Sequence, residues 1–288
     1  MYFDKVVDAI EKRAANSIQT DTKDYLDDQG LLVCGNCNTR KQCVVDLFGK
    51  KRTPFCLCKC MKEKLESEER ELERQKFIQK IKDLRQMGFP DEEMMNLTFA
   101  KDDKANPNLS YAAQKYVEHF SKMMKDGKGL LLFGDVGGGK TFMSACIANA
   151  LIDQGHPCMV TNFARLINTL SGMYEGKQKY IDGLNKFDLL VIDDLAAERD
   201  TEYMNETVQN IIDNRYRCKK PLIVTTNLTA EELQNPIDIK KKRIYSRLAE
   251  MCIPVKVNGI DRRKKKRSEN FKEYQDLLGL GKTLQNAI

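Results

Sequence analysis

One stretch of this chain combines closely spaced glycines with a lysine and a threonine. It reads GDVGGGKT from Gly134 to Thr141, follows the apolar run Leu130–Phe133 and precedes an apolar segment with helical spacing. A strand, a glycine-rich turn and a helix in this order form a P-loop, whose backbone N–H groups surround a polyphosphate. The residues we expect around a nucleotide here are Gly134, Asp135, Val136, Gly137, Gly138, Gly139, Lys140, Thr141 and Phe142.

The lysine and the threonine of this motif have separate roles in such a loop. We expect Lys140 to contact the β- and γ-phosphates of ATP, and the Thr141 hydroxyl to ligate Mg²⁺. The following helix begins beneath the phosphates, where its N-terminal partial positive charge favours an anion.

A second stretch places two carboxylates at the end of an apolar run. Residues 187–194 read FDLLVIDD, so the run leads directly into Asp193 and Asp194. This is the Walker B pattern, in which a buried strand brings an aspartate to the edge of a sheet. We expect Asp193 to hold Mg²⁺ together with Thr141, and Asp194 to orient or deprotonate the attacking water.

A third apolar run also ends in a polar residue. Residues 221–227 read PLIVTTN, which predicts a buried strand with Asn227 at its end. Asn227 could contact the γ-phosphate or the attacking water. An asparagine in this position is also an ordinary turn or helix-cap residue.

Six of the ten cysteines lie between Cys34 and Cys60. Cys34 and Cys37 form a C-x-x-C pair, and the sequence CLCKC ends at Cys60. We expect Cys34, Cys37, Cys58 and Cys60 to hold Zn²⁺ in a closed tetrahedral thiolate site. Cys56 is the main rival for the second pair, with Cys43 as a spare. The alternative is that these are reduced cysteines buried as small apolar residues.

The composition limits the classes of protein that need to be considered. The chain has 288 residues, 41% hydrophobic and 31% charged, which suffices for one good core and a smaller unit. No apolar run approaches the ~20 residues that cross a bilayer, and the charged N-terminus does not resemble a signal peptide. We therefore predict a cytoplasmic protein, in which clustered cysteines bind metal rather than form disulfides.

The patterns predict four segments. Residues 1–61 form a helical and cysteine-rich module, with an amphipathic helix to about residue 28 and a small β-hairpin within 44–52. Residues 62–95 form a linker, a long solvated helix that ends at Gly88 and Pro90. Residues 96–267 form the nucleotide-binding domain, and 268–288 form a C-terminal tail.

Several further elements are expected between residues 91 and 257. Residues 91–107 read as a loop, and residues 109–126 as a helix. A strand is predicted over 158–162, a helix over 163–175, and a last short strand over 253–257.

Residues from about 96 to 263 resemble the helicase loaders of the DnaC/DnaI type and the related IstB transposition helpers, which are AAA+ ATPases. The segments that carry the resemblance are Gly134–Thr141, Val191–Leu195, Asp213–Tyr216, Thr225–Leu228 and Arg243–Leu248. The cysteine module and the charged helix are similar to the N-terminal part of phage and Gram-positive loaders. The resemblance therefore covers most of the chain.

The resemblance implies a fold and two further site residues. It implies an α/β fold with a five-stranded parallel sheet, in which the P-loop strand is strand 1 and the order is 5-1-4-3-2. It implies that Arg247 is an arginine finger reaching the ATP of a neighbouring subunit, and that Arg263 is the second sensor. A surface arginine on a basic helix is the alternative for Arg247, and Arg262 competes with Arg263.

Two positions depart from the common pattern of these ATPases. Most AAA+ proteins have glutamate where this chain has Asp194, which predicts slow hydrolysis. Gly138 stands where family members often have threonine, a change that we expect to be tolerated.

The implied function is that of a loader that binds a replicative DnaB-type helicase and single-stranded DNA and self-associates through its ATPase domain. The basic runs 240–243 and 262–267 are candidates for phosphate contacts with that DNA, or for a solvated surface. One alternative is an IstB-like helper that directs a transposase, although such helpers generally lack a cysteine-rich module. Another is a zinc adaptor that binds nucleotide without hydrolysing it.

Overall fold

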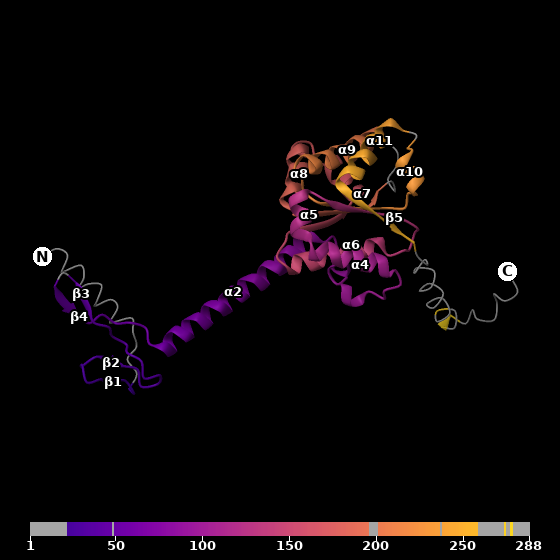
Figure 1. Cartoon of the computed structure of the whole chain (residues 1–288). Helices are drawn as coiled ribbons and strands as arrows, with labels where there is room; N and C mark the ends of the chain where they lie inside the picture. Colours follow the sequence, from indigo (N-terminus) through magenta and orange to yellow (C-terminus); the bar gives the residue numbers. More distant parts are fainter. Residues whose placement is uncertain are drawn as a thin grey trace. The chain divides into compact units, whose positions relative to one another are not determined.

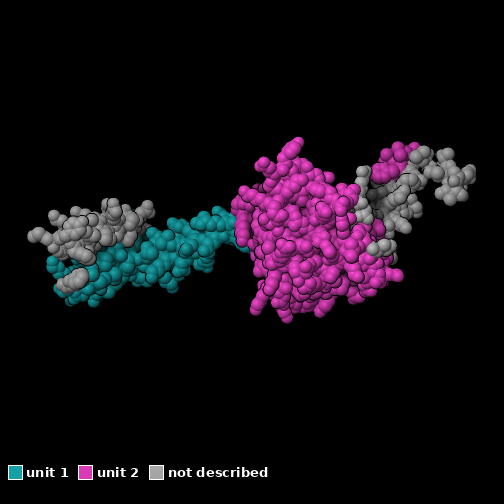
Figure 2. All heavy atoms as spheres, turned by 90° about the horizontal axis from the view of Figure 1, so that it is seen from above, with its two compact units in different colours: residues 1–78 teal, residues 79–288 magenta. Residues whose placement is uncertain are grey.

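A computed structural model of the chain describes residues 22–47, 49–195, 201–236 and 238–258, together with positions 274, 277 and 278. It divides the chain into two units, residues 1–78 and 79–288 (Figure 2). The boundary falls within one long helix, α2 (Lys59–Gly88).

The first unit contains two short antiparallel pairs of strands. They are β1 (Tyr25–Leu26) with β2 (Leu32–Val33), and β3 (Val45–Leu47) with β4 (Lys50–Arg52). The second pair is the predicted hairpin, and Gly49 turns it with a left-handed φ of 78°.

The prediction of a helix reaching to about residue 28 is wrong over its described part. Residues 22–28 form turns and strand β1, whereas residues 1–21 lie outside the described residues. The Asp27 carboxylate accepts hydrogen bonds from the amides of Gln29 (2.9 Å) and Leu31 (3.0 Å). This side chain thereby offers the backbone a turn in place of a helix.

Helix α2 confirms the predicted long solvated helix and its end at Gly88. Charged residues surround most of it, and its buried residues are Leu84 and Gly88, near the C-terminal end. A Cβ at Gly88 would lie 2.3 Å from the Cys158 carbonyl oxygen, so the helix approaches this backbone closely. Arg85 also pairs with Asp153 at 2.5 Å.

The second unit alternates helices and strands (Figure 1). Its elements are α3 (Glu92–Met95), η1 (Phe99–Lys101), α4 (Pro107–Glu118), α5 (Phe120–Asp126), β5 (Gly129–Gly134), α6 (Lys140–Asp153), β6 (Cys158–Asn162), α7 (Phe163–Ser171), α8 (Lys177–Gly183), η2 (Leu184–Lys186), β7 (Leu189–Leu195), α9 (Glu202–Arg217), β8 (Leu222–Thr226), α10 (Ala230–Gln234), α11 (Ile239–Met251) and β9 (Cys252–Val257).

The five strands β5 to β9 form one parallel sheet in the order β6-β7-β8-β5-β9. Counted from the P-loop strand, this is the order 5-1-4-3-2 that the family resemblance implied. Strand β8 therefore lies between β5 and β7, and the ends of the three strands that carry the sequence motifs are neighbours. Pro254 lies in β9, an edge strand, where a missing backbone N–H is tolerated.

Alternate residues of the strands pack into two cores, one on each face of the sheet. Helices cover both faces (Figure 1). Leu130 and Leu132 of β5 join the core that contains Ile147 of α6. Leu131 joins the core that contains Ile211 of α9 and residues of α7 and α11. The strands are buried on both faces, which explains their continuous apolar runs.

Three predicted elements in this unit differ from the structure. The predicted loop 91–107 contains α3 and η1, and Asn149 of α6 donates to the carbonyls of Met94 (2.9 Å) and Leu97 (2.8 Å). The predicted helix 109–126 is broken at His119, a break that separates α4 from α5 and accompanies the packing of Phe120 against His156 at a ring distance of 5.0 Å. The helix predicted to end at residue 175 ends at Ser171.

Of the described helices, none combines the length and the apolar composition that crossing a bilayer takes.

Candidate nucleotide site and cysteine cluster

The glycine-rich loop joins β5 to α6 and takes conformations that other residues rarely adopt. Gly134, Gly137 and Gly139 have φ values of 124°, 79° and 92°. A Cβ at Gly134 would also lie 2.5 Å from the Val257 carbonyl oxygen of the neighbouring strand β9. The loop is therefore folded as a P-loop because glycine stands where a side chain would be strained or blocked.

Lys140 begins α6 and its side chain is buried beneath this loop. Its ammonium group donates to the carbonyl oxygens of Gly134 (2.9 Å) and Asp135 (2.8 Å) and to Asn227 Oδ1 (2.8 Å). The P-loop lysine and the predicted sensor asparagine are thus in direct contact, although they are far apart in the sequence. Strand β8 brings Asn227 there.

Thr141 and Asp193 also meet at this edge of the sheet. The Thr141 hydroxyl lies 3.0 and 2.9 Å from the two carboxylate oxygens of Asp193. Carboxylate and hydroxyl oxygens are the hard ligands that Mg²⁺ prefers, so this pair fits the cation that accompanies a nucleotide.

Thr225 is a site residue that the sequence analysis did not single out. It is fully buried on β8, and its hydroxyl donates to Asp193 Oδ1 at 2.5 Å. The Thr225 hydroxyl oxygen also accepts a hydrogen bond from the Asp194 amide at 3.0 Å. Thr225 therefore fixes both aspartates of the Walker B segment. Its position near the end of β8, two residues before Asn227, is the signal that could have found it.

The two aspartates lie in different environments. Asp193 is buried, and this desolvation raises the pKa of its carboxyl group despite hydrogen bonds from Thr225 and Thr141. Asp194 is exposed and has a left-handed φ of 56° at an irregularity in the pairing of β7 with β8. Such strained backbone is common at functional sites. It separates a buried carboxylate suited to a cation from an exposed one suited to a water molecule.

Arg215 anchors the strands that carry these residues. This arginine belongs to the 213–216 segment of the family resemblance, and its side chain is almost completely buried. Its guanidinium donates to the carbonyl oxygens of Phe187 (2.9 Å) and Pro221 (2.6 Å), just before β7 and β8. Burial lowers the pKa of Arg215 to about 10. It thereby holds together the starting ends of two neighbouring strands.

The other predicted residues of the nucleotide site differ in their exposure to solvent. Asp135 and Val136 are exposed on the loop, Gly138 is buried, and Phe142 packs at the margin of the core around α6. Arg263 and the basic run 262–267 lie outside the described residues.

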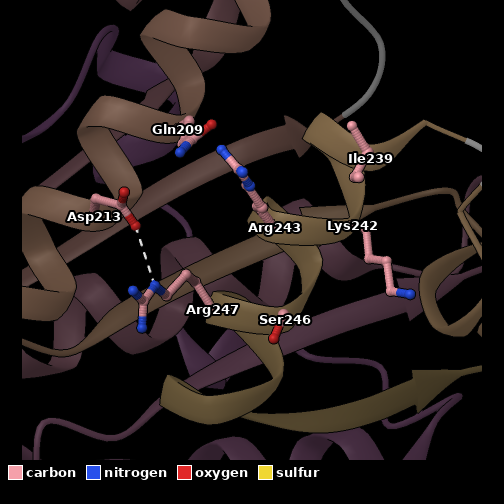
Figure 3. Close-up of a pocket in the computed structure, with 7 residues that line it drawn as sticks. All are labelled: Gln209, Asp213, Ile239, Lys242, Arg243, Ser246 and Arg247. Carbon is pink, nitrogen blue, oxygen red and sulfur yellow. Dashed lines mark ion pairs between the residues drawn. The ribbon is translucent and has the colours of Figure 1, made fainter.

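Arg247 lies elsewhere, on α11, and lines a pocket of about 540 Å³ (Figure 3). The pocket is lined by Gln209 and Asp213 of α9 and by Ile239, Lys242, Arg243, Ser246 and Arg247 of α11. No P-loop or Walker B residue is among them, so Arg247 does not line its pocket together with its own chain's nucleotide motifs.

Four cysteines of the first unit form a cluster. The sulfur atoms of Cys34, Cys37, Cys58 and Cys60 all lie within 4.8 Å of one another. These are the four predicted ligands, and the arrangement could hold one metal ion. The thiol of the rival Cys56 instead contacts the Arg40 carbonyl oxygen at 3.5 Å.

The cysteines of the cluster differ in acidity. A hydrogen bond from Thr39 helps to lower the pKa of Cys37 to about 5. Contacts with the other thiols raise the pKa of Cys60 to about 12. Four closely packed sulfur atoms can all ionise only when a positive charge offsets their repulsion.

Polar side chains around the cluster hold its two halves. The Thr39 hydroxyl lies 3.0 Å from Cys37 Sγ and accepts the Lys59 amide at 2.9 Å. Asp24 accepts the Gly35 amide at 3.2 Å and pairs with the ammonium group of Lys41 at 2.6 Å. Lys41 and Asp24 are almost completely buried, so this ion pair belongs to the interior of the module.

Comparison with known proteins places this site in a family. Residues 59–270 match the family described as IstB-like ATP binding protein. The chain is 25% identical over 209 residues to the replicative helicase loader DnaI of Bacillus subtilis, covering 67% of this chain and 66% of DnaI. It is 32% identical over 132 residues to a putative insertion sequence ATP-binding protein of Sinorhizobium fredii, covering 45% and 43%.

The matches span less than two thirds of the length of these curated relatives. Among solved structures, the crystal structure of DnaI superposes with a TM-score of 0.51 at 22% identity, covering 60% of this chain and 96% of that one. This likeness supports the fold of the nucleotide-binding unit.

Proposed function

This chain belongs to the family of IstB-like ATP-binding proteins, and we propose that it is an ATP-dependent loader of a replicative helicase. The observation that carries the proposal is the meeting of Lys140, Thr141, Asp193 and Asn227 at one sheet edge. The similarity to DnaI, which extends over 67% of the chain, favours loading over other uses of such a site.

The proposed ATPase step uses each of these residues in turn. Lys140 would leave the loop carbonyls to contact the β- and γ-phosphates, and Thr141 and Asp193 would hold Mg²⁺. Asp194 takes a proton from the water that attacks the γ-phosphorus, and the bond to ADP breaks. Asn227, in contact with Lys140, senses whether the γ-phosphate is present. The short Asp194 side chain makes this step slow.

Arg247 is proposed to act on the nucleotide of a second copy of the chain. A guanidinium supplied across a subunit interface stabilises charge on the transferred phosphoryl group. The position of Arg247 on α11, in a pocket without P-loop residues, supports a role toward a different nucleotide from its own. The chain would therefore self-associate when ATP is bound.

The cysteine cluster is proposed to bind one Zn²⁺ and to fold the helicase-binding module around it. Four thiolates in a closed site are typical of structural zinc, and a module this small gains its folding energy from the metal. Single-stranded DNA is proposed to contact the basic run 240–243 of the assembled chains.

The test is ATP turnover and helicase transfer with purified components. We expect slow turnover that single-stranded DNA and a replicative helicase change, co-purification with that helicase, and its transfer to circular single-stranded DNA. Lys140→Ala should abolish ATP binding and transfer. Binding of ATP without turnover would instead support the zinc adaptor.

The insertion-sequence relative keeps a second function in view. A transposition helper would bind double-stranded DNA and a transposase, and would leave a replicative helicase unbound. Co-purification with candidate partners therefore separates the two functions.

A further inference from the structure

The Arg247 guanidinium contacts three side chains of the same chain. Arg247 Nε lies 3.3 Å from Asp213 Oδ1, and Nη1 lies 3.8 Å from Glu250 Oε2. The guanidinium carbon lies 4.4 Å from the centre of the Tyr216 ring. Figure 3 shows Arg247 turned from α11 toward Asp213 on α9.

The holding groups form a connected set. The Tyr216 hydroxyl donates to Glu250 Oε1 at 2.5 Å, so the ring beneath the guanidinium is itself anchored. Helices α9 and α11 pack on the same core. Asp213 and Tyr216 of α9 therefore lie beside Arg247 of α11. The guanidinium is consequently kept in one place without a ligand.

This hold is weak by its geometry. A strong arginine–carboxylate contact is bidentate with two short parallel bonds, whereas Asp213 makes one contact at 3.3 Å and Glu250 one at 3.8 Å. The Arg247 side chain is 44% exposed, and exposed ion pairs contribute little to stability. Polyphosphate oxygens offer more charge and a better match to the guanidinium, so they would replace Asp213.

The surrounding pocket favours such an exchange. Lys242 and Arg243 add two positive charges to its lining, against the single carboxylate of Asp213.

We propose that the ion pair with Asp213 restrains Arg247 until the phosphates of ATP, carried by a second copy of the chain, displace Asp213 from the guanidinium. Asp213 thereby sets the protein concentration at which the chain assembles with ATP. This inference rests on the proposed role of Arg247 and assigns its regulation to Asp213, with Tyr216 and Glu250 as the platform.

The test measures self-association of the full chain in the presence of ATP and Mg²⁺, by sedimentation velocity over a range of protein concentrations. Asp213→Asn keeps the shape of the side chain and removes its charge. We expect it to lower the concentration for half-maximal assembly by about two- to fivefold, the scale of an exposed ion pair. Asp213→Ser should change it in the same direction, which guards against a folding defect of one variant.

Glu206→Gln is the matched control, because Glu206 is an exposed acid of the same helix and the change alters the net charge equally. It should leave the concentration unchanged. Arg247→Ala should raise the concentration for half-maximal assembly. Adding Asp213→Asn to that variant should not lower it, because Asp213 would have no arginine to restrain.

Unchanged or weaker assembly of Asp213→Asn would overturn this inference alone, as would a gain that persists without Arg247. If Arg247→Ala assembled like the parent chain, or if the parent chain did not assemble with ATP, the proposed function of Arg247 would fail as well.

Discussion

The nucleotide site and the cysteine cluster solve the same problem, holding polar groups in place, by different means. The first lies at the edge of a five-stranded sheet with a core on each face. The second lies among two-stranded pairs in which several apolar residues, such as Leu26, Val45 and Leu47, are exposed.

The two sites depend on their ligands to different degrees. At the sheet edge, Lys140, Thr141 and Asp193 already have hydrogen-bond partners supplied by the fold. The cysteine cluster instead crowds four thiols that repel one another once ionised. We infer that the nucleotide site is preorganised by burial, whereas the cysteine module needs its metal to fold.

Removal of zinc should have the largest effect, because it tests whether the first unit, unlike the second, needs its ligand to fold. A strong chelator, or Cys58→Ser, should unfold the first unit, since structural zinc supplies about 10–16 kcal/mol of binding energy in small modules. The second unit should keep its melting temperature. Zinc analysis, limited proteolysis and calorimetry measure the two parts, and Cys43→Ser is the control because Cys43 is outside the cluster. An intact first unit in the metal-free protein would contradict this view.

Removal of the P-loop lysine should abolish function while sparing the fold. Lys140→Ala should weaken ATP binding at least about 100-fold, roughly 3 kcal/mol, because the main cation at the phosphates is lost. Titration calorimetry gives the affinity, and thermal unfolding reports the fold. Lys177→Ala, an exposed lysine of α8, should bind ATP normally. If the Lys140 variant bound ATP as tightly as the parent chain, the assignment of the nucleotide site would be wrong.

Loss of the buried lysine of the cysteine module should weaken zinc binding. Lys41→Met leaves the Asp24 carboxylate without its partner near four thiolates, so zinc affinity should fall by about 10- to 100-fold. Competition with a coloured chelator measures it. Lys64→Met, which changes an exposed lysine of α2, should retain the parent affinity. Equal zinc affinity in both variants would show that the ion pair does not support the site.

The charge of Asp193 should cost the nucleotide-free protein a little stability. Because burial raises the pKa of Asp193 in the folded state, folding favours its protonated form. That contribution is present below the unfolded pKa and is lost as pH rises through the folded one. Asp193→Asn should therefore raise stability at neutral pH by about 1 kcal/mol, with a smaller gain as pH falls toward 4.

Thermal unfolding of the nucleotide-free protein at several pH values checks the last prediction. Asp182→Asn, an exposed acid of α8, serves as the control for a general change of charge. A gain that did not shrink on acidification would contradict the assigned cause.

The local motifs of this protein were determined by its sequence. Gly134–Thr141, the apolar run ending in Asp193 and the paired cysteines each predict chemistry from neighbouring residues, because loop, strand and ligand pattern depend on local backbone preferences. The family resemblance implied the order of the sheet, which the structure confirms. The predictions of a helix over residues 22–28, of a loop over 91–107 and of an unbroken helix over 109–126 were wrong, because side-chain contacts such as those of Asp27 and Asn149 override local propensity.

The contacts between side chains that are far apart in the sequence depend on the tertiary structure. It put Asn227 on Lys140, Thr225 on Asp193 and Asp213 beside Arg247, and it chose Cys58 and Cys60 over Cys56. These contacts depend on strand order, register and helix packing, which arise from burial of apolar residues throughout each unit. A residue's own neighbours in the sequence do not contain that information, so the partners of the motifs emerge only when the chain is folded.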